Sequence, residues 1–277
     1  MPELPEVETI KNQLNKKIKG KKIIGIKIFL PKIIKAPLKN FRRAVLNSKI
    51  SKIERRAKLI IISLSNSYSL LIHLKMTGQL IYKNAKIKNN ESQKYTHLIF
   101  YFKNRGQLIY NDLRQFGYIK LIKTAQAIKL LEKEYGPEPL DKKFLLDIFK
   151  KLLARKPGKK KIKQFLMDQK NIAGIGNIYA DEILFFAGIM PTRKISTLSA
   201  DENKKIYKNI KKILANAIKF RGSSVNDYLD SQGRAGEYHL RLKVYSRNSQ
   251  PCKKCKTKIQ KIKINGRGTH FCPKCQK

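Results

Sequence analysis

Residues 171–182 read NIAGIGNIYADE, in which a short glycine turn leads into a helix. Gly174 and Gly176 form the turn, and Asn177 stands at the start of the helix. From about residue 142 onward, apolar residues recur with helical spacing rather than with the alternation of a strand. The second half of the chain is therefore predicted to be a helical domain that contains this stretch.

The clearest helix of this domain begins after Ser199. Glu202 stands three residues beyond the serine, which is the spacing of a capping box. The apolar residues that follow mark one buried face, and Gly222 is expected to end the helix. This face consists of Ile206, Ile210, Ile213, Leu214 and Ala217.

The first half of the chain begins with a helix and then turns to β-structure. Pro5 suits the first turn of a helix over residues 5–20, and Gly20 suits its end. Up to about residue 123, short β-branched and aromatic runs alternate with turns, and strands at this spacing predict a two-layer β-sandwich. The runs are IIGIKIFL, LIIISL, YSLLIHL, HLIFYF and QLIYND.

A stretch that contains proline and glycine, EKEYGPEPLD at residues 132–141, separates the two halves and is read as a linker. The chain is thus predicted to be an α+β protein of two domains. A β-sandwich with its N-terminal helix occupies residues 1–131, and a helical domain occupies residues 142–240. A small module with all four cysteines follows at residues 241–277.

This module has the spacing of a zinc site. Two CxxC pairs, Cys252 with Cys255 and Cys272 with Cys275, flank sixteen residues that read as a hairpin turning near Asn265-Gly266. Four thiolates leave no open position for water, so one structural Zn²⁺ is expected. Two disulfides or free thiols are the alternative. Arg267 falls on the hairpin tip, where it is either a solvated turn residue or part of a site.

The charge balance points to a polyanionic partner. Lys and Arg number 62 against 19 Asp and Glu, which gives a formal net charge of +43. Nucleic acid is the first candidate and an anionic membrane the second. An AT-rich genome would explain part of the lysine excess but not the scarcity of acids. No apolar run is long enough to span a membrane and no signal peptide is apparent, so a cytoplasmic location is expected.

The N-terminal residues carry the candidate chemistry. If Met1 is removed, Pro2 becomes a secondary amine whose pKa of about 7.7–8.0 leaves about a quarter of it neutral at physiological pH. A neutral amine can attack an electrophilic sugar carbon, and the adjacent Glu3 can act as the acid there. The alternative is that Pro2 and Pro5 merely begin a helix. The four histidines, at positions 73, 97, 239 and 270, show no catalytic pattern.

MPELPEVET resembles the amino terminus of the formamidopyrimidine-DNA glycosylases, which excise oxidised purines and then cut the abasic strand. RRAKLIIISL, HLKMTG, NDLRQFG and NIAGIGNIYADEILFFAGI follow in that family's order, before the cysteine module. NIAGIGNIYADE is the most specific segment, because it resembles the hairpin and helix of the family's helix–two-turn–helix element. The resemblance implies a monomeric bacterial-type, nucleoid-associated enzyme that acts on double-stranded DNA with oxidised bases or abasic sites.

The resemblance also implies roles for four catalytic residues. Pro2 would attack C1′ of the damaged nucleotide, and Glu3 would protonate the sugar ring oxygen. Lys58, in RRAKLIIISL, would assist β-elimination, and Arg267 would clamp phosphate and support δ-elimination.

Further residues are implied to bind DNA. His97, Arg114 and Asn177 would contact the backbone, together with Lys159 or Lys163 from the lysine-rich run. Three residues match those that fill the gap left by the extruded base: Met76, Arg114 and Phe116. On pattern alone Met76 and Phe116 read equally as core residues at strand ends. Residues 223–247 resemble the segment with the loop that closes on the flipped base.

Two departures and two alternatives remain open. Family members often have Gly where this chain has Lys75, and a second base where it has Gln115. One alternative is the sibling endonuclease VIII type, which prefers oxidised pyrimidines; Leu4 and the long closing segment favour the purine enzyme. The other is a non-catalytic zinc-ribbon protein that binds nucleic acid, for which charge and cysteines would suffice.

Overall fold

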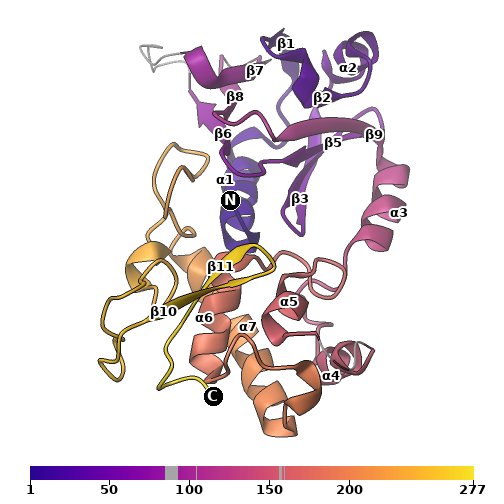
Figure 1. Cartoon of the computed structure of the whole chain (residues 1–277). Helices are drawn as coiled ribbons and strands as arrows, with labels where there is room; N and C mark the ends of the chain where they lie inside the picture. Colours follow the sequence, from indigo (N-terminus) through magenta and orange to yellow (C-terminus); the bar gives the residue numbers. More distant parts are fainter. Residues whose placement is uncertain (85–92, 104, 156–157, 159) are drawn as a thin grey trace. The chain divides into compact units, whose positions relative to one another are not determined.

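The computed structural model describes residues 1–84, 93–103, 105–155, 158 and 160–277. The chain folds into two compact units, which Figure 1 shows in sequence colours. The first unit comprises Met1–Lys133 and Phe220–His239, and the second comprises Glu134–Lys219 and Leu240–Lys277. The functional division expected from the sequence, with boundaries at residues 131, 141 and 240, stays a prediction.

The first unit is a two-layer β-sandwich, as predicted. One sheet has the strand order β1-β7-β8-β6, and the other has the order β2-β9-β5-β4-β3. All pairings are antiparallel except that of β2 with β9. The strands of the first sheet are β1 (Ile23–Ile28), β7 (Thr96–Phe102), β8 (Gln107–Asp112) and β6 (Gly78–Lys83); those of the second are β2 (Ile34–Lys35), β9 (Tyr118–Lys123), β5 (Tyr68–His73), β4 (Leu59–Leu64) and β3 (Ile50–Arg56).

Among the described residues, the α-helices of the first unit are α1 (Leu4–Ile18), α2 (Leu38–Val45) and α3 (Thr124–Glu134), the last of which ends one residue beyond it. Val7, Ile10, Leu14 and Ile18 of α1 form one buried stripe, which confirms the helix predicted over residues 5–20. Helix α1 packs against β3, β4 and β6, so it covers the side of the sandwich where the edge strands β3 and β6 lie. Helix α3 reaches three residues into the stretch read as a linker.

The second unit is helical, as predicted, and carries a short hairpin. Its helices are α4 (Leu146–Ala154), α5 (Ile162–Met167), α6 (Asn177–Ala187) and α7 (Ala200–Lys219), and its strands are β10 (Gln260–Ile264) and β11 (Arg267–Phe271). Before α7, the Ser199 hydroxyl accepts from the Glu202 amide at 3.2 Å, and the Glu202 carboxylate accepts from the Ser199 amide at 2.8 Å. The capping box is confirmed, although the helix ends at Lys219 instead of at Gly222.

The turn before α6 has the geometry that its glycines predict. Gly174 has a positive φ of 86°, and Gly176 caps the helix in an extended conformation. Asn177 is therefore the first residue of α6. Within the described part of the chain, none of the helices has both the length and the apolar character needed to cross a lipid bilayer.

Candidate functional site

Pro2 and Glu3 lie buried at the start of α1. The Glu3 amide donates to the Glu6 carboxylate at 2.7 Å, and the same carboxylate accepts from the Ser223 amide at 2.8 Å. Gly222 is needed beside it, because a Cβ there would lie 2.6 Å from the Glu6 carboxylate. Glu6 therefore fixes the backbone beside Pro2 against the segment that follows α7. This role of Glu6 was not predicted, although the Glu3-x-x-Glu6 spacing at a helix start is a signal for it.

Lys58 lies on the turn between β3 and β4, the two neighbouring strands against which α1 packs, and its side chain is buried. Arg55 shapes this turn, since it donates to the Ala57 carbonyl at 2.9 Å and to the Glu8 carboxylate of α1 at 2.7 Å. Burial alone would raise the pKa of Glu8, but the ion pairs with Arg55 and Lys11 outweigh it and lower that pKa. The Glu8–Arg55 pair thus holds the Lys58 turn against the first helix.

His73 lies among positive charges near this turn. Burial, followed by the charges of Lys75 and Lys58, lowers the pKa of His73 to about 3. Its Nδ1 accepts from the Lys75 amide at 3.0 Å, which requires that nitrogen to be unprotonated. His73 is therefore neutral at physiological pH. The Lys75 ammonium lies 5.8 Å from the centre of the Tyr118 ring.

The three residues expected to fill the gap in DNA lie on two loops, 74–77 and 113–117. Phe116 is 56% exposed, and the Arg114 guanidinium lies 4.7 Å from the centre of its ring. Met76 is half-buried. The exposure of Phe116 argues against the alternative that it is a core residue. Lys75 and Gln115, the two departures from the family pattern, have positive φ values of 50° and 57°, where glycine would be favoured.

His97 is buried, whereas a residue that contacts DNA at the surface would be exposed. It lies on β7 with 5% of its surface exposed, and its Nε2 is 2.7 Å from the Asp112 carbonyl oxygen. Its expected contact with the DNA backbone stays a prediction. The structure shows its hydrogen bond to Asp112 at the end of β8.

The segment expected to close on the flipped base is anchored in the first unit at residues 230–231. Buried Asp230 accepts from Gln13 of α1 at 2.9 Å, and the Ser231 carbonyl accepts from the Tyr82 amide of β6 at 2.8 Å. Gly233 follows with a φ of 78°. Its amide donates a hydrogen bond to the Asp230 carbonyl at 3.0 Å, which closes the turn.

In the second unit, buried polar groups attach the hairpin strand β11 to α5 and α6. The Lys163 ammonium lies 2.6 Å from the Asp181 carboxylate and 2.8 Å from the Thr269 hydroxyl. The other Asp181 oxygen accepts from the His270 amide at 2.8 Å. The Asn177 side chain donates to the Gly268 carbonyl at 3.0 Å. These bonds fix the strand that begins at Arg267.

This network bears on the expected phosphate contact of Lys163, which stays a prediction. Lys163 has only 1% of its side chain exposed and is engaged within the protein, so its burial argues against a phosphate contact. Lys159, the other candidate, lies outside the described residues.

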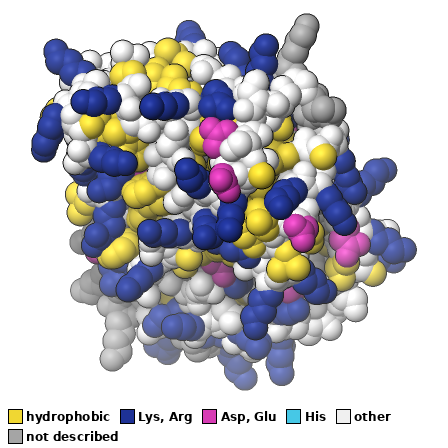
Figure 2. Space-filling view, turned by 90° about the horizontal axis from the view of Figure 1, so that it is seen from below, with side chains coloured by type: hydrophobic (Ala, Val, Ile, Leu, Met, Phe, Trp, Pro, Cys, Tyr) yellow, Lys and Arg dark blue, Asp and Glu magenta, His cyan; other side chains and the backbone are white. Residues whose placement is uncertain are grey.

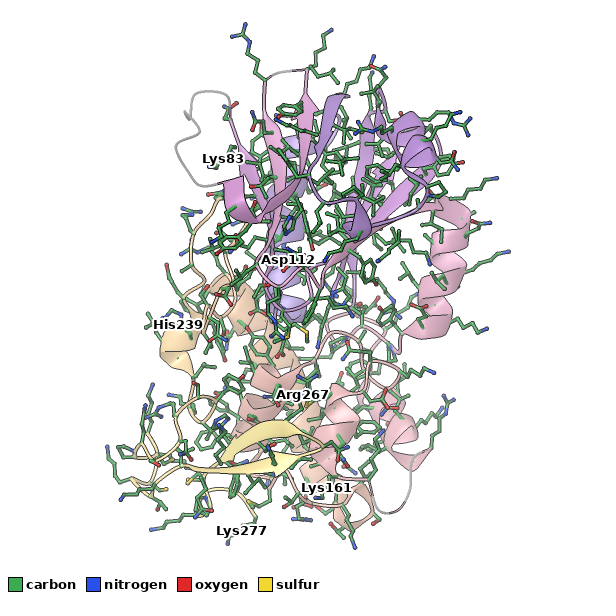
Figure 3. All side chains as sticks on the ribbon, turned by 45° about the horizontal axis from the view of Figure 1, so that its top comes forward. Lys83, Asp112, Lys161, His239, Arg267 and Lys277 are labelled. Carbon is green, nitrogen blue, oxygen red and sulfur yellow. The ribbon has the colours of Figure 1, made fainter. Side chains whose placement is uncertain are left out.

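Arg267 is exposed at the start of β11, as the sequence predicts. The hairpin turns at Asn265 and Gly266, whose φ values of 45° and 72° suit a two-residue turn. Arg267 lines a hollow of about 270 Å³ between the hairpin and α5, with Lys160 at its wall. Figure 3 labels Arg267 on this hairpin, and Figure 2 shows Lys and Arg side chains spread over the visible face with few acids between them. The basic surface suits an anionic ligand, whereas the wall of the hollow also includes Asp168, which pairs with Lys160 at 2.9 Å.

The four cysteines come together as a metal site. All four sulfur atoms lie within 4.8 Å of one another, and none is in a disulfide. The Sγ–Sγ distances are 3.4 Å for Cys255–Cys272 and 3.9 Å for Cys252–Cys275, near the ~3.8 Å that tetrahedral zinc–thiolate bonds impose. The four thiolates therefore fit one structural Zn²⁺.

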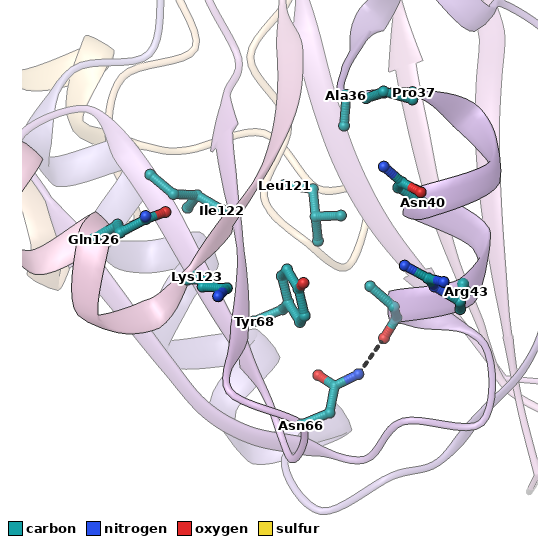
Figure 4. Close-up of a pocket in the computed structure, with 11 residues that line it drawn as sticks. Ala36, Pro37, Asn40, Arg43, Asn66, Tyr68, Leu121, Ile122, Lys123 and Gln126 are labelled. Atoms are coloured by element: carbon teal, nitrogen blue, oxygen red, sulfur yellow. Dashed lines mark hydrogen bonds between the residues drawn. The ribbon is translucent and has the colours of Figure 1, made fainter.

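A second hollow, of about 500 Å³, lies in the first unit between α2, β9 and the β4–β5 turn (Figure 4). The Asn66 side chain donates to the Ala44 carbonyl at 2.7 Å along one wall, and Arg43 and Lys123 stand at its edge. The residues that line it include no carboxylate, histidine or cysteine, so it is no candidate for the catalytic chemistry.

Comparisons with known proteins agree with this arrangement. Residues 1–119 match the formamidopyrimidine-DNA glycosylase N-terminal domain, residues 135–228 match its H2TH domain, and residues 249–277 match a zinc finger found in FPG and IleRS. The formamidopyrimidine-DNA glycosylase of Pelotomaculum thermopropionicum is 44% identical, covering 100% of this chain and 99% of the relative.

Solved structures give the same result. The Lactococcus lactis Fpg in complex with abasic-site DNA is 38% identical, with a TM-score of 0.90 and 99% of each chain covered. MutM in complex with DNA that contains carbocyclic 8-oxo-G is 38% identical, with a TM-score of 0.90 and 100% of each chain covered. The chain belongs to the formamidopyrimidine-DNA glycosylase family.

Proposed function

We propose that this protein is a base-excision-repair DNA glycosylase that removes oxidised purines and then cuts the abasic strand as a lyase. The observation that carries this proposal is the full-length family match, which brings the sandwich, the helical domain and the zinc finger together in one chain. Solved relatives are bound to DNA with an abasic site or a damaged guanine, and this chain is proposed to take the same substrates.

Pro2 is proposed as the nucleophile once Met1 has been removed. Its neutral amine attacks C1′, the glycosidic bond breaks with its electron pair leaving on the base, and Glu3 delivers a proton to the ring oxygen as the sugar opens. The resulting iminium joins Pro2 to C1′. The Glu3–Glu6–Ser223 hydrogen bonds support this role, because they fix the backbone at the attacking end of the chain.

Elimination follows from the iminium. Loss of a C2′ proton expels the 3′ phosphate, and a second elimination expels the 5′ phosphate. We assign assistance in the first elimination to Lys58, whose turn is held against α1, and phosphate binding to Arg267, a bidentate donor exposed on its hairpin. Water then hydrolyses the iminium and regenerates the Pro2 amine.

DNA binding is assigned to the basic surface, to the first turn of α6 and to the exposed loops. The Asn177 amide belongs to the first turn of α6, whose backbone N–H groups form the positive end of the helix dipole, which suits phosphate. Met76, Arg114 and Phe116 are proposed to enter the gap that the extruded nucleotide leaves. The protein is further proposed to act as a monomer on the bacterial nucleoid, as suits a repair enzyme whose named relatives are bacterial.

Strand cleavage on a set of matched duplexes tests the proposal. A duplex with 8-oxoguanine opposite cytosine should be cleaved faster than duplexes with an oxidised pyrimidine in the same position. Preference for the pyrimidine duplexes would support the endonuclease VIII alternative. Binding without cleavage of any duplex would support the zinc-ribbon alternative and refute the enzyme.

A further inference from the structure

The loops that carry the proposed gap-filling residues cross the sandwich side by side. Residues 74–77 run from β5 to β6, and residues 113–117 run from β8 to β9, so each loop passes from one sheet to the other. Gly78 is the register partner of Asp112, and His73 is the partner of Tyr118, which places both crossings at the same end of the sandwich.

A single buried carboxylate joins these loops. Asp112, the last residue of β8 and labelled in Figure 3, is fully buried. One of its oxygens accepts from the Thr77 hydroxyl at 2.6 Å and from the Arg114 amide at 3.3 Å. The other accepts from the Gly117 amide at 2.8 Å and from the Tyr110 hydroxyl at 3.5 Å. One donor, Thr77, therefore lies next to Met76 on the first loop, and two donors, the Arg114 and Gly117 amides, stand on either side of Phe116 on the second.

The surrounding residues keep this carboxylate in place. Burial, and then the Asp112 charge, raises the pKa of Tyr110, so its phenol keeps the proton that it donates. Gly117 allows the close approach, because a Cβ there would lie 1.8 Å from the Tyr110 hydroxyl. The Asp112 carbonyl is also the partner of His97.

The loops need such support. Each has one non-glycine residue in the left-handed region, Lys75 on one and Gln115 on the other. Strained backbone of this kind persists only where neighbouring contacts over-determine it, and the Asp112 hydrogen bonds supply those contacts. Phe116 and Arg114 themselves are exposed, so little packing of their own holds them.

We propose that Asp112 is the positioning residue of the gap-filling loops: its buried carboxylate holds Met76, Arg114 and Phe116 in the geometry that replaces an extruded nucleotide. This inference rests on the proposed glycosylase function. Asp112 does not touch the reacting atoms and acts through the loops, so its loss should impair extrusion in a duplex while leaving the Pro2 chemistry intact.

The test compares two substrates with Asp112→Asn. The asparagine amide presents N–H groups where one carboxylate oxygen accepts, so one set of loop bonds is lost. Single-turnover excision of 8-oxoguanine from a duplex should fall about 10- to 100-fold, the loss expected for a displacement of about 1 Å. Cleavage of a single-stranded abasic oligonucleotide, which needs no extrusion, should stay within about twofold of wild type.

Two further variants secure the result. In a Phe116→Ala background, Asp112→Asn should cost less on the duplex than it does in wild type, because Phe116 is one of the residues that Asp112 is proposed to position. Glu54→Gln is the control, because it also removes one negative charge but from an exposed side chain away from the two loops. This variant should match wild type on both substrates. If Asp112→Asn does not fold, Thr77→Val, which removes one of the four donors, should show the same substrate pattern at smaller size.

The outcomes separate two failures. Three results would overturn the positioning role: Asp112→Asn slows cleavage of both substrates equally, it slows neither, or its effect on the duplex is the same with and without Phe116→Ala. A wild-type protein that cleaves neither substrate would instead overturn the proposed function itself, and this role with it.

Discussion

The buried ion pair between Lys163 and Asp181 gives the sharpest stability prediction. Its two charged atoms lie 2.6 Å apart with side chains 1% and 0% exposed. Asp181→Asn leaves the Lys163 ammonium buried without its counter-charge, a change that typically costs about 3–5 kcal/mol. It also weakens the acceptor of the His270 amide, whose hydrogen bond to a charged group contributes about 1.5–3 kcal/mol. These effects overlap, so we expect a loss of about 4 kcal/mol in the second unit.

Hydrogen exchange of the β10 and β11 amides other than His270, whose own acceptor is altered, is the assay. These amides report local opening of the hairpin even when the two units unfold separately. The double variant Lys163→Met/Asp181→Leu should recover the part of the loss that comes from the unpaired charge, because apolar residues of similar volume often replace a buried ion pair at little cost. It should not recover the part that comes from the His270 amide, which still lacks its acceptor. Asp168→Asn is the control: its pair with Lys160 is about a third exposed and should be worth less than about 1 kcal/mol. A loss below about 1 kcal/mol for Asp181→Asn, or a double variant whose loss equals the sum of the two single losses, would show that the pair does not stabilise the second unit in this way.

Three further predictions follow from the site. Removal of zinc by a chelator, or Cys252→Ser, should disorder the hairpin that carries Arg267 and weaken DNA binding; normal binding by verified metal-free protein would contradict this. Because unfolded chain takes up a proton at His73 below about pH 6.5 and the folded protein does so only near pH 3, stability should fall on acidification between these values, by up to about 2 kcal/mol at pH 5. His73→Asn should flatten this part of the pH profile of urea unfolding, and an unchanged profile would exclude His73 as its source. DNA affinity should fall steeply with salt in titrations from about 50 to 200 mM, and a flat response would argue against binding through several phosphates.

Local patterns were sufficient for much of the fold. The apolar stripe of α1, the Ser199 capping box and the Asn265-Gly266 turn each depend on residues within one or two turns of chain, and the structure confirms all three. The cysteine cluster was also predictable, because its spacing is a direct record of its chemistry.

Long-range contacts explain what the sequence did not reveal. Lys163 lies in a lysine-rich run that reads as surface, yet it is buried because Asp181 lies eighteen residues further along the chain and meets it in space. Asp112 ends an ordinary strand, and its partner Thr77 is 35 residues away. Helix α3 was missed because the proline and glycine that follow it dominated the pattern there. Met76 and Phe116 were ambiguous for a related reason, since exposure depends on the whole sandwich.

The catalytic role of Pro2 can be measured directly by trapping the covalent intermediate. Protein with its N-terminal processing verified by mass is mixed with a duplex that has 8-oxoguanine opposite cytosine, and borohydride is added. We expect a stable protein–DNA cross-link that peptide mass spectrometry places on Pro2, and we expect Pro2→Gly to lose this cross-link while largely retaining DNA binding. A cross-link on a lysine, or undiminished trapping by Pro2→Gly, would contradict the assignment of Pro2 as the nucleophile.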